Sequence, residues 1–187
     1  MRLILASTST YRRKLLNRLC LPFEQISPDF EEKQPGSMTP EKLVRFNTLG
    51  KAQSVLSIYP DATVIASDQI AVCDKLVLGK PGNIEKACNQ LRMLSGRTVT
   101  FMTGLAVLSE HAVKYETIPF HVSFRQLADD DIRTYVGIEQ PLDCTGSFKS
   151  EGLGICLFER LQGDDPTALI GLPLIRLSQW LEPLKQL

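Results

Sequence analysis

Two segments of the chain carry side chains suited to phosphate chemistry, and the first runs from Ser7 to Arg13. It holds hydroxyl groups on Ser7 and Ser9 and guanidinium groups on Arg12 and Arg13. It lies between an apolar tetrapeptide and a helical pattern, so the backbone N–H groups of a helix start would add further donors. Together these groups form an anion cradle. The alternative interpretation is a helix cap with solvated arginines. The segment is not a Walker A loop, because it lacks the glycines and the terminal Lys-Ser/Thr.

The second segment centres on Asp68. It follows the apolar run 62–66, which we interpret as a buried strand ending at Ser67 and Asp68. In open α/β sheets, ligands bind at the carboxyl ends of strands. If the two strands run parallel, Asp68 and Arg12 face one cleft, where a carboxylate can hold Mg²⁺ or position a water. The alternative is an aspartate that only caps a turn.

Other charged residues are weaker candidates. Glu31 and Glu32 offer a metal-binding carboxylate, and Lys51 and Lys80 offer phosphate contacts. For all four, a solvated surface position is the alternative.

The composition of the chain disfavours several functional classes of protein. The chain has 187 residues, enough for one domain or two small lobes with a real hydrophobic core. Its 21 basic and 21 acidic residues balance, which disfavours broad binding to nucleic acid. The two histidines, His111 and His121, are not paired with a nucleophile or a metal cluster in the sequence, which disfavours Ser-His-Asp and zinc-hydrolase chemistry.

Cysteine usage and hydropathy indicate the compartment. The five cysteines are odd in number and form no C-x-x-C pair, so we expect reduced thiols rather than disulfides or structural zinc. The apolar run 3–6 is too short for a signal-peptide core, and no run approaches the roughly 20 residues of a membrane span. We therefore expect a cytoplasmic protein without a membrane partner.

Periodicity predicts the elements that position these residues. Predicted strands cover 3–6, 62–66, 98–108 and 113–124, with another near 156–158. Predicted helices begin after Ser9, at Thr39-Pro40, at Asn83 and at Asp129, and a final helix covers about 174–184. Glu110-His111 would turn the third and fourth strands into an antiparallel hairpin. This order predicts an α/β fold, a mixed twisted sheet flanked by helices, in a single domain over 1–187.

The charged segments belong to a set of blocks that resembles a known family. The set comprises Ser7-Thr8-Ser9 with Arg12-Arg13, Ala66-Ser67-Asp68-Gln69, Leu78-Gly79-Lys80-Pro81, Gly146-Ser147-Phe148-Lys149-Ser150-Glu151-Gly152 and Gly171-Leu172-Pro173-Leu174. In content and order these blocks resemble the Maf-like nucleotide pyrophosphatases. The resemblance implies an elongated, two-lobed Maf/ITPase-like fold with a central cleft, and a homodimer.

The resemblance also implies an activity. Members hydrolyse nucleoside triphosphates to the monophosphate and pyrophosphate with a divalent metal cation, Mg²⁺ or Mn²⁺. Ser67-Asp68-Gln69 and the block ending in Glu151-Gly152 are similar to the YceF-type branch, described as 7-methyl-GTP pyrophosphatases. The dTTP/UTP branch usually has threonine after the catalytic aspartate and glutamine at the position of Glu151.

Residue roles follow from the same resemblance. Asp68 would be the proton acceptor and, with Glu32, a metal ligand. Substrate specificity would rest on Tyr11, Gln69 and Glu151. Phosphate contacts would come from Ser7, Ser9, Arg12, Arg13, Lys51 and Lys80. The chain departs from the family pattern at Tyr11, where tryptophan is common in this branch, and at Arg45-Phe46-Asn47-Thr48, where an Arg-Leu-Ala pattern is expected.

The chemistry of the base agrees with this substrate. Methylation at N7 makes guanine cationic, and a cationic ring stacks on an aromatic face such as that of Tyr11. The carboxylate of Glu151 can accept from guanine N1–H and N2–H₂, and it would repel a pyrimidine carbonyl. The alternatives are a pyrophosphatase for dTTP, UTP or another modified nucleotide, a nucleotide-binding regulator of cell division without turnover, and a reader of methylated RNA caps.

Overall fold

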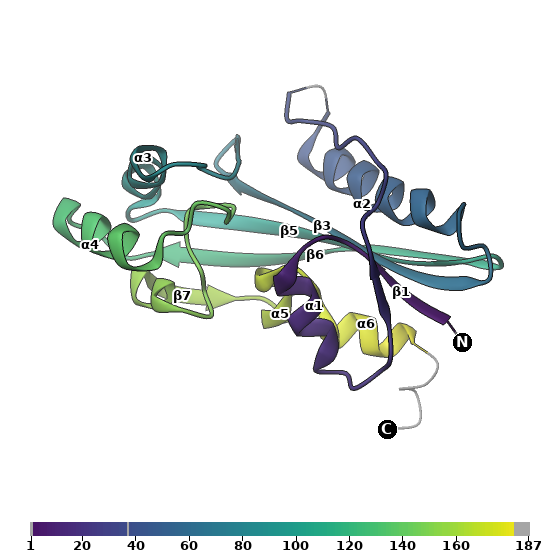
Figure 1. Ribbon diagram of the computed structural model, residues 1–187. Coiled ribbons are helices and arrows are strands. Elements are labelled where there is room, and N and C mark those ends of the chain that lie inside the picture. The colour runs from purple at the N-terminus through teal and green to yellow at the C-terminus, as the bar shows by residue number, and fades with distance from the viewer. Residues whose placement is uncertain (1, 37, 182–187) are drawn as a thin grey trace. The chain divides into compact units, whose positions relative to one another are not determined.

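The protein is described by a computed structural model over residues 2–36 and 38–181. Its elements in chain order are β1 (Arg2–Ala6), α1 (Thr10–Asn17), β2 (Glu24–Ile26), α2 (Pro40–Leu56), β3 (Ala62–Cys73), β4 (Leu76–Leu78), α3 (Ile84–Leu94), β5 (Thr98–Ser109), β6 (Ala112–Phe124), α4 (Asp129–Glu139), the 3₁₀ helix η1 (Leu153–Leu157), β7 (Phe158–Gln162), α5 (Pro166–Ile170) and α6 (Leu174–Trp180). Figure 1 labels all of them except β2, β4 and η1.

Within the described residues, seven strands form one sheet. Its order is β2-β1-β3-β5-β6-β7, and β4 pairs with β3. Strand β1 is parallel to both β2 and β3, whereas β4 and β7 are antiparallel to β3 and β6. The predicted mixed α/β sheet flanked by helices is therefore confirmed, and β5 and β6 are joined at Glu110-His111 as predicted.

Residue contacts divide the chain into two compact units. Unit 1 comprises Met1–Gln69, Met102–Ile118 and Asp165–Leu187, and unit 2 comprises Ile70–Phe101 and Pro119–Asp164. The boundaries fall inside β3, β5 and β6, so these three strands contribute residues to both units. Two units agree with the expectation of two lobes, while a single functional domain over 1–187 and the central cleft remain predictions.

Unit 1 is a sheet with helices on both faces, because side chains alternate between the faces of a strand. Odd-numbered residues such as Leu5, Ile65 and Leu105 join a buried cluster with α1, α5 and α6. Even-numbered residues such as Ile4 and Val64 join a second cluster with α2. Figure 1 shows α2 on one side of β1 and β3 and the other three helices on the opposite side. Residues on both faces of β1 and β3 are buried, which explains their nearly continuous apolar sequences.

The helix starts near the candidate site are set by local chemistry. The side chain of Ser9 accepts the backbone N–H of Arg12 and caps α1, as predicted. Thr39 likewise caps α2, with Pro40 at the first helical position. Asn83 caps α3 in unit 2. These three helix starts could be predicted because the capping side chain and the backbone N–H that it accepts are only three positions apart in the sequence.

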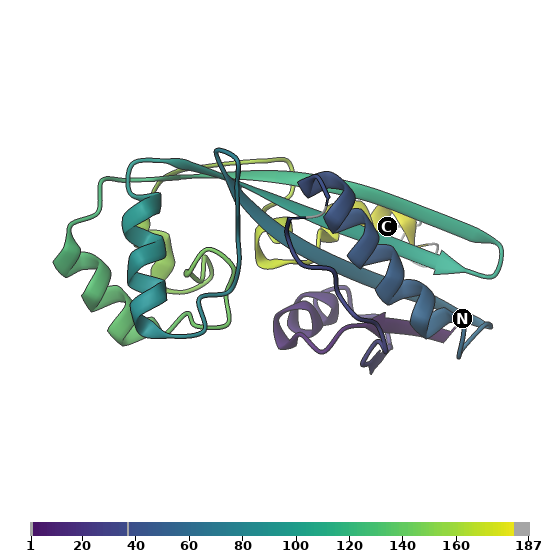
Figure 2. The same cartoon turned by 90° about the horizontal axis from the view of Figure 1, so that it is seen from above.

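Unit 2 has its own aromatic core. Phe148 packs edge-to-face against Phe101, Phe124 and Phe158, with ring centroids 4.8 to 5.6 Å apart. Helices α3 and α4 lie side by side, in teal and green in Figure 2. The side chain of Phe148, from the Gly-Ser-Phe-Lys block, is therefore a core residue of unit 2.

Several predicted boundaries are wrong. Strand β3 does not end at Asp68 but continues to Cys73. The last strand begins at Phe158, because 153–157 form a 3₁₀ helix. Asp129 does not cap α4; it is the first residue of that helix, and its carboxylate pairs with Arg92 and Arg133. Helix α6 ends at Trp180, and the predicted continuation over 182–184 lies outside the described residues.

Four elements were not predicted: β2, β4, η1 and α5 are each three to five residues long. Such short elements carry too few residues for a periodic pattern to appear. In the part of the chain that the structure describes, no helix combines the length and apolar character needed to cross a bilayer.

Gly104 on β5 allows α2 to pack closely against the sheet. A Cβ at this position would lie 2.3 Å from Oγ1 of Thr48, a β-branched and fully buried side chain of α2. We expect Gly104→Ala to lower the free energy of unfolding by about 1–3 kcal/mol through overpacking. Chemical denaturation monitored by circular dichroism measures this.

The matched control is Gly137→Ala on α4, where an added Cβ meets nothing within 4 Å. That change should leave stability equal or raise it by up to about 1 kcal/mol, since alanine is the better helix former. Equal effects of the two substitutions would contradict the close approach at Gly104.

Candidate active site

The site lies where β1 ends beside β3. The two strands are parallel, as the sequence argument required, and Leu5 is paired with Ile65. This is the last pair of the two strands, and Ser7 and Ser67 each come two residues after it, with Asp68 next along β3. The turn from Ser7 to Arg13, called the Ser/Arg turn below, therefore follows a strand that is paired with the strand of Asp68.

Strand alternation sends the residues around Asp68 to opposite faces. The hydroxyl of Ser67 lies 2.7 Å from the carbonyl oxygen of Gly104 and 2.8 Å from that of Gly171. The Gln69 amide nitrogen donates to the carbonyl oxygen of Ala168 at 2.8 Å, and also to Thr103 and Leu169. Ser67 and Gln69 thus hold the segment around α5, whereas Asp68 points toward α2.

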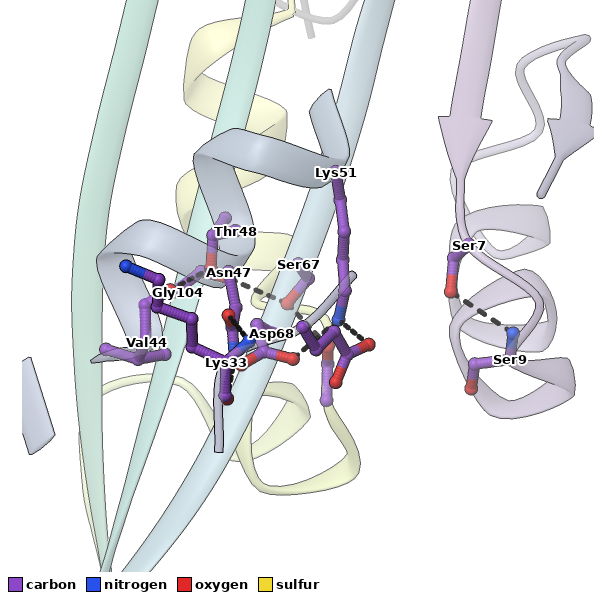
Figure 3. A network of polar contacts seen from close by, with 12 residues as sticks. Ser7, Ser9, Lys33, Val44, Asn47, Thr48, Lys51, Ser67, Asp68 and Gly104 are labelled. Carbon is purple, nitrogen blue, oxygen red and sulfur yellow. Dashed lines mark hydrogen bonds and ion pairs between the residues drawn. The ribbon is translucent and has the colours of Figure 1, made fainter. Parts of the chain in front are cut away.

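On the α2 face, two carboxylates meet one ammonium group. Nζ of Lys51 lies 2.6 Å from Oδ1 of Asp68 and 2.7 Å from Oε1 of Glu32. The side chains of Lys51 and Asp68 are only 6% and 9% exposed, and that of Glu32 is 49% exposed. Figure 3 shows Lys51 and Asp68 pointing toward one another beneath α2. The structure thus brings together three predicted site residues and pairs Lys51 with carboxylates.

The turn after β1 is held by its own hydrogen bonds. The hydroxyl of Ser7 accepts the N–H of Ser9, and that of Ser9 accepts the N–H of Arg12 (Figure 3 shows Ser7 and Ser9). The side chain of Gln25 donates to the carbonyl oxygens of Ser7 and Ser9. An accepting hydroxyl keeps its own hydrogen as a donor, so both serines still have a proton suited to an anion.

Arg12 of this turn lies near the two carboxylates of Asp68 and Glu32. Its Nε donates to the carbonyl oxygen of Gly171 at 2.9 Å, the same oxygen that Ser67 contacts. Burial lowers the pKa of Arg12, and the negative charges of Asp68 and Glu32 act in the opposite direction. An arginine remains charged in either case. The guanidinium group therefore lies within electrostatic reach of both carboxylates.

Asn47, which departs from the expected family pattern, fixes the loop that carries Glu32. Its side-chain amide accepts the N–H of Lys33 at 2.9 Å and donates to the carbonyl oxygen of Lys33 at 3.1 Å. The ring of Phe30 fills the space above Gly50, where a Cβ would lie 2.1 Å from Cε2 of the ring. Sequence reasoning missed Asn47, and the only signal was that a buried-face position of α2 carries an amide.

The remaining predicted residues of unit 1 lie on α1. Tyr11 is half-buried and Arg13 is exposed. Both are in the first turn after Ser9, so they share the helix N-terminus with Arg12.

Lys80 and Glu151 belong to unit 2. Lys80 is exposed in the loop after β4. Glu151 is also exposed, and its carboxylate lies 3.4 Å from the hydroxyl of Ser150. The structure thus places these two predicted residues in solvent-accessible loops of their own unit.

The loop that presents Glu151 is anchored at Lys149 and Leu153. The N–H of Lys149 donates to the hydroxyl of Tyr135, and its ammonium group donates to the carbonyl oxygen of Glu139. The carboxylate of Glu139 accepts the N–H of Leu153 at 2.8 Å. Both ends of the five-residue stretch 149–153 around Glu151 are therefore held by α4.

A family model described as "Maf-like protein" matches residues 2–184. The chain belongs to this family. The Maf-like chain is 51% identical over 181 residues to a protein of Pseudomonas aeruginosa named "7-methyl-GTP pyrophosphatase", with 96% of this chain and 94% of that protein covered. It is 49% identical over 177 residues to a protein of the same name from Colwellia psychrerythraea, with 94% and 88% covered.

A third relative with that name, from Idiomarina loihiensis, is 50% identical over 183 residues, with 96% and 92% covered. A solved structure titled "The structure of the Staphylococcus aureus Ham1 protein" aligns with 69% of this Maf-like chain and 73% of that chain, at 19% identity and a TM-score of 0.44. The family assignment rests on the family model and the sequence relatives.

Among the described residues of this Maf-like chain, no three or more His, Cys, Asp or Glu side chains gather as a ready-made metal centre. The acidic oxygens at the site are those of Asp68 and Glu32.

Removal of the Asn47 amide should loosen the Glu32 loop. We expect Asn47→Ala to raise the amide hydrogen-exchange rate of Lys33 about 3- to 10-fold, the effect of losing a net hydrogen bond. Exchange measured by NMR or mass spectrometry checks this.

Gln53→Ala, an exposed change on the same helix, is the matched control and should leave Lys33 unaffected. Equal protection of Lys33 in Asn47→Ala and the unmodified protein would show that Asn47 does not hold the loop.

Proposed function

We propose that this chain is a nucleoside triphosphate pyrophosphatase that converts 7-methyl-GTP to 7-methyl-GMP and pyrophosphate. The observation that carries the proposal is the buried carboxylate of Asp68, placed beside Glu32 and within electrostatic reach of Arg12. A buried carboxylate among cations suits the activation of a water next to a phosphate chain. Relatives that are 49–51% identical and carry the name 7-methyl-GTP pyrophosphatase support this substrate.

The phosphate chain would lie at the N-terminus of α1. Backbone N–H groups of the first helical turn, the hydroxyl groups of Ser7 and Ser9, and the guanidinium groups of Arg12 and Arg13 are all donors for phosphate oxygens. The hydrogen bond between Arg12 and Gly171 orients the guanidinium group before a ligand binds. Prior orientation reduces the entropy lost on binding.

Asp68 and Glu32 would hold the divalent cation. Two carboxylate oxygens that converge within 2.7 Å of one ammonium group fit a hard cation, which prefers oxygen ligands. Mg²⁺ commonly uses one or two protein carboxylates and takes its other ligands from phosphates and water. When bound, the cation supplies charge neutralisation to the phosphate oxygens.

Asp68 would also accept the proton of the attacking water. The oxygen of the water bonds to the α phosphorus, and the bond between that phosphorus and the oxygen that bridges to the β phosphate breaks. The proton released by the water passes to the carboxylate of Asp68. Arg12, Arg13 and Lys80 would stabilise the negative charge that develops on the leaving pyrophosphate. A carboxylate has two oxygens, so one can accept a proton while the other faces a cation.

Tyr11 and Glu151 would select the base. The Tyr11 ring offers a π face to the cationic 7-methylguanine, and the Glu151 carboxylate accepts the N1–H and N2–H₂ donors. The amide nitrogen of Gln69 is committed to the segment around α5, so any contact of Gln69 with the base would use its Oε1. The family resemblance further supports a single functional domain and a cytoplasmic homodimer.

A pyrophosphate-release assay over canonical and 7-methylated nucleoside triphosphates, with and without Mg²⁺ or Mn²⁺, tests the function. We expect the highest kcat/KM for 7-methyl-GTP, and only with metal. Asp68→Asn should lower kcat by about two to four decades, the usual contribution of a general base.

Other results of this assay would change or remove parts of the proposed function. Preference for dTTP or UTP would change the substrate, and near-normal turnover by Asp68→Asn would remove its role as proton acceptor. Nucleotide binding without pyrophosphate release from any substrate would favour a binding regulator.

Glu151→Gln tests base selection. An amide at this position can donate to a carbonyl, so we expect kcat/KM for unmethylated or pyrimidine nucleotides to rise relative to that for 7-methyl-GTP. The same substrate panel measures the ratio. An exposed acidic residue of the same unit, Glu159, gives the control Glu159→Gln. An unchanged ranking of substrates in Glu151→Gln would contradict a role in base choice.

A further inference from the structure

Lys51 occupies the position that a metal ion would need. Its ammonium group lies 2.6 Å from Asp68 and 2.7 Å from Glu32, and its side chain is 6% exposed. Metal–oxygen distances are 2.0–2.6 Å for Mg²⁺ and Ca²⁺. A cation bound to these same two oxygens would therefore take the space that Nζ now fills.

The surroundings explain why this ammonium is held so firmly. Two carboxylates brought together under α2 repel each other, and Asp68 is nearly excluded from water. An unpaired buried charge is strongly destabilising, so the pair needs a positive partner. Lys51 supplies that charge from within the chain, since it is on the buried face of α2 opposite β3.

We propose that Lys51 is an internal counter-cation that competes with the divalent metal for Asp68 and Glu32. The metal is admitted when Lys51 leaves the carboxylates, and the phosphate chain of the nucleotide gives the ammonium group a new anionic partner. Metal alone therefore binds weakly, and metal and nucleotide strengthen each other's binding. The inference rests on the proposed function for the divalent metal at Asp68 and Glu32 and for the identity of the nucleotide.

The lysine side chain suits such an exchange. Its four-carbon stem is flexible and its three N–H donors have no fixed fork geometry, so the ammonium can change partners without moving the helix. The two carboxylate partners of Lys51 also differ in exposure to solvent. Glu32 is half exposed, so one of the two ion pairs can open directly to solvent.

Direct metal binding tests the competition. Mn²⁺ titrations followed by electron paramagnetic resonance, without nucleotide, give the dissociation constant for the unmodified protein and for Lys51→Met. Methionine keeps an unbranched side chain, one atom shorter than that of lysine, and removes the charge. We expect Lys51→Met to bind Mn²⁺ at least about 10-fold more tightly, since a charge worth about 1.4 kcal/mol or more no longer opposes the metal.

Lys42→Met is the matched control, because Lys42 is an exposed residue of the same helix. It should bind Mn²⁺ like the unmodified protein. Equal dissociation constants for Lys51→Met and the unmodified protein would overturn the proposal.

Folding gives a second readout. Should Lys51→Met unfold in metal-free buffer, added Mn²⁺ should restore a cooperative melting transition, because the metal replaces the missing charge. Failure of Mn²⁺ to restore folding would mean that Lys51 is a fixed structural ion pair, and would overturn the competition.

A non-hydrolysable α,β-methylene analogue of 7-methyl-GTP tests the coupling. It should tighten Mn²⁺ binding by a larger factor in the unmodified protein than in Lys51→Met, where only direct coordination by phosphate remains. Equal factors would contradict the exchange of partners. The two metal-only measurements do not depend on turnover, so they can succeed when the pyrophosphate assay fails, and the reverse also holds.

Discussion

Side chains alternate along β3, and the arrangement of the candidate site follows from that constraint. Three consecutive residues divide between the two faces of the sheet: Ser67 and Gln69 contact the segment around α5, and Asp68 contacts α2. A one-residue shift in register would exchange the faces and bury Asp68 against the carbonyl groups of that segment. The parallel pairing with β1 fixes the register, and it also places the Ser/Arg turn beside Asp68.

Helix α2 supplies the side chains that surround Asp68 and hold the loop of Glu32. Thr48 lies against Gly104, and this contact sets the distance between α2 and the sheet. Lys51 follows Thr48 by about one helical turn and contacts the carboxylates of Asp68 and Glu32. Asn47 holds the loop of Glu32 on the same helix. The carboxylate of Glu32 is thus brought to Asp68 by contacts that are mostly local to α2, while Asp68 itself is placed by the sheet.

Much of the fold could be predicted from the sequence because the decisive signals are local. The caps at Ser9, Thr39 and Asn83 and the long hairpin were each recognisable within a few residues. Asp68 was wrongly taken as the end of a strand, since aspartate is disfavoured in strands. Its tertiary ion pair with Lys51 outweighs that preference, and β3 continues to Cys73.

The candidate site could be predicted only in part. The ordered blocks identified most of the residues, but not their partners, because a partner such as Gly171 is more than 100 residues away from Ser67. Lys51 was predicted to contact phosphate, and no sequence pattern indicated that it holds two carboxylates. Asn47 appeared only as a departure from the family pattern, since its value depends on the backbone of Lys33 in three dimensions.

The carbonyl group of Gly171 has a consequence for how the protein is made. It accepts hydrogen bonds from both Arg12 and Ser67, and its φ of 117° suits glycine in particular. During synthesis, β1, α1 and β3 leave the ribosome long before this carbonyl exists. The nascent chain therefore lacks this acceptor for Arg12 until residue 171 has been added, so the hydrogen bond that orients the guanidinium group forms late in translation.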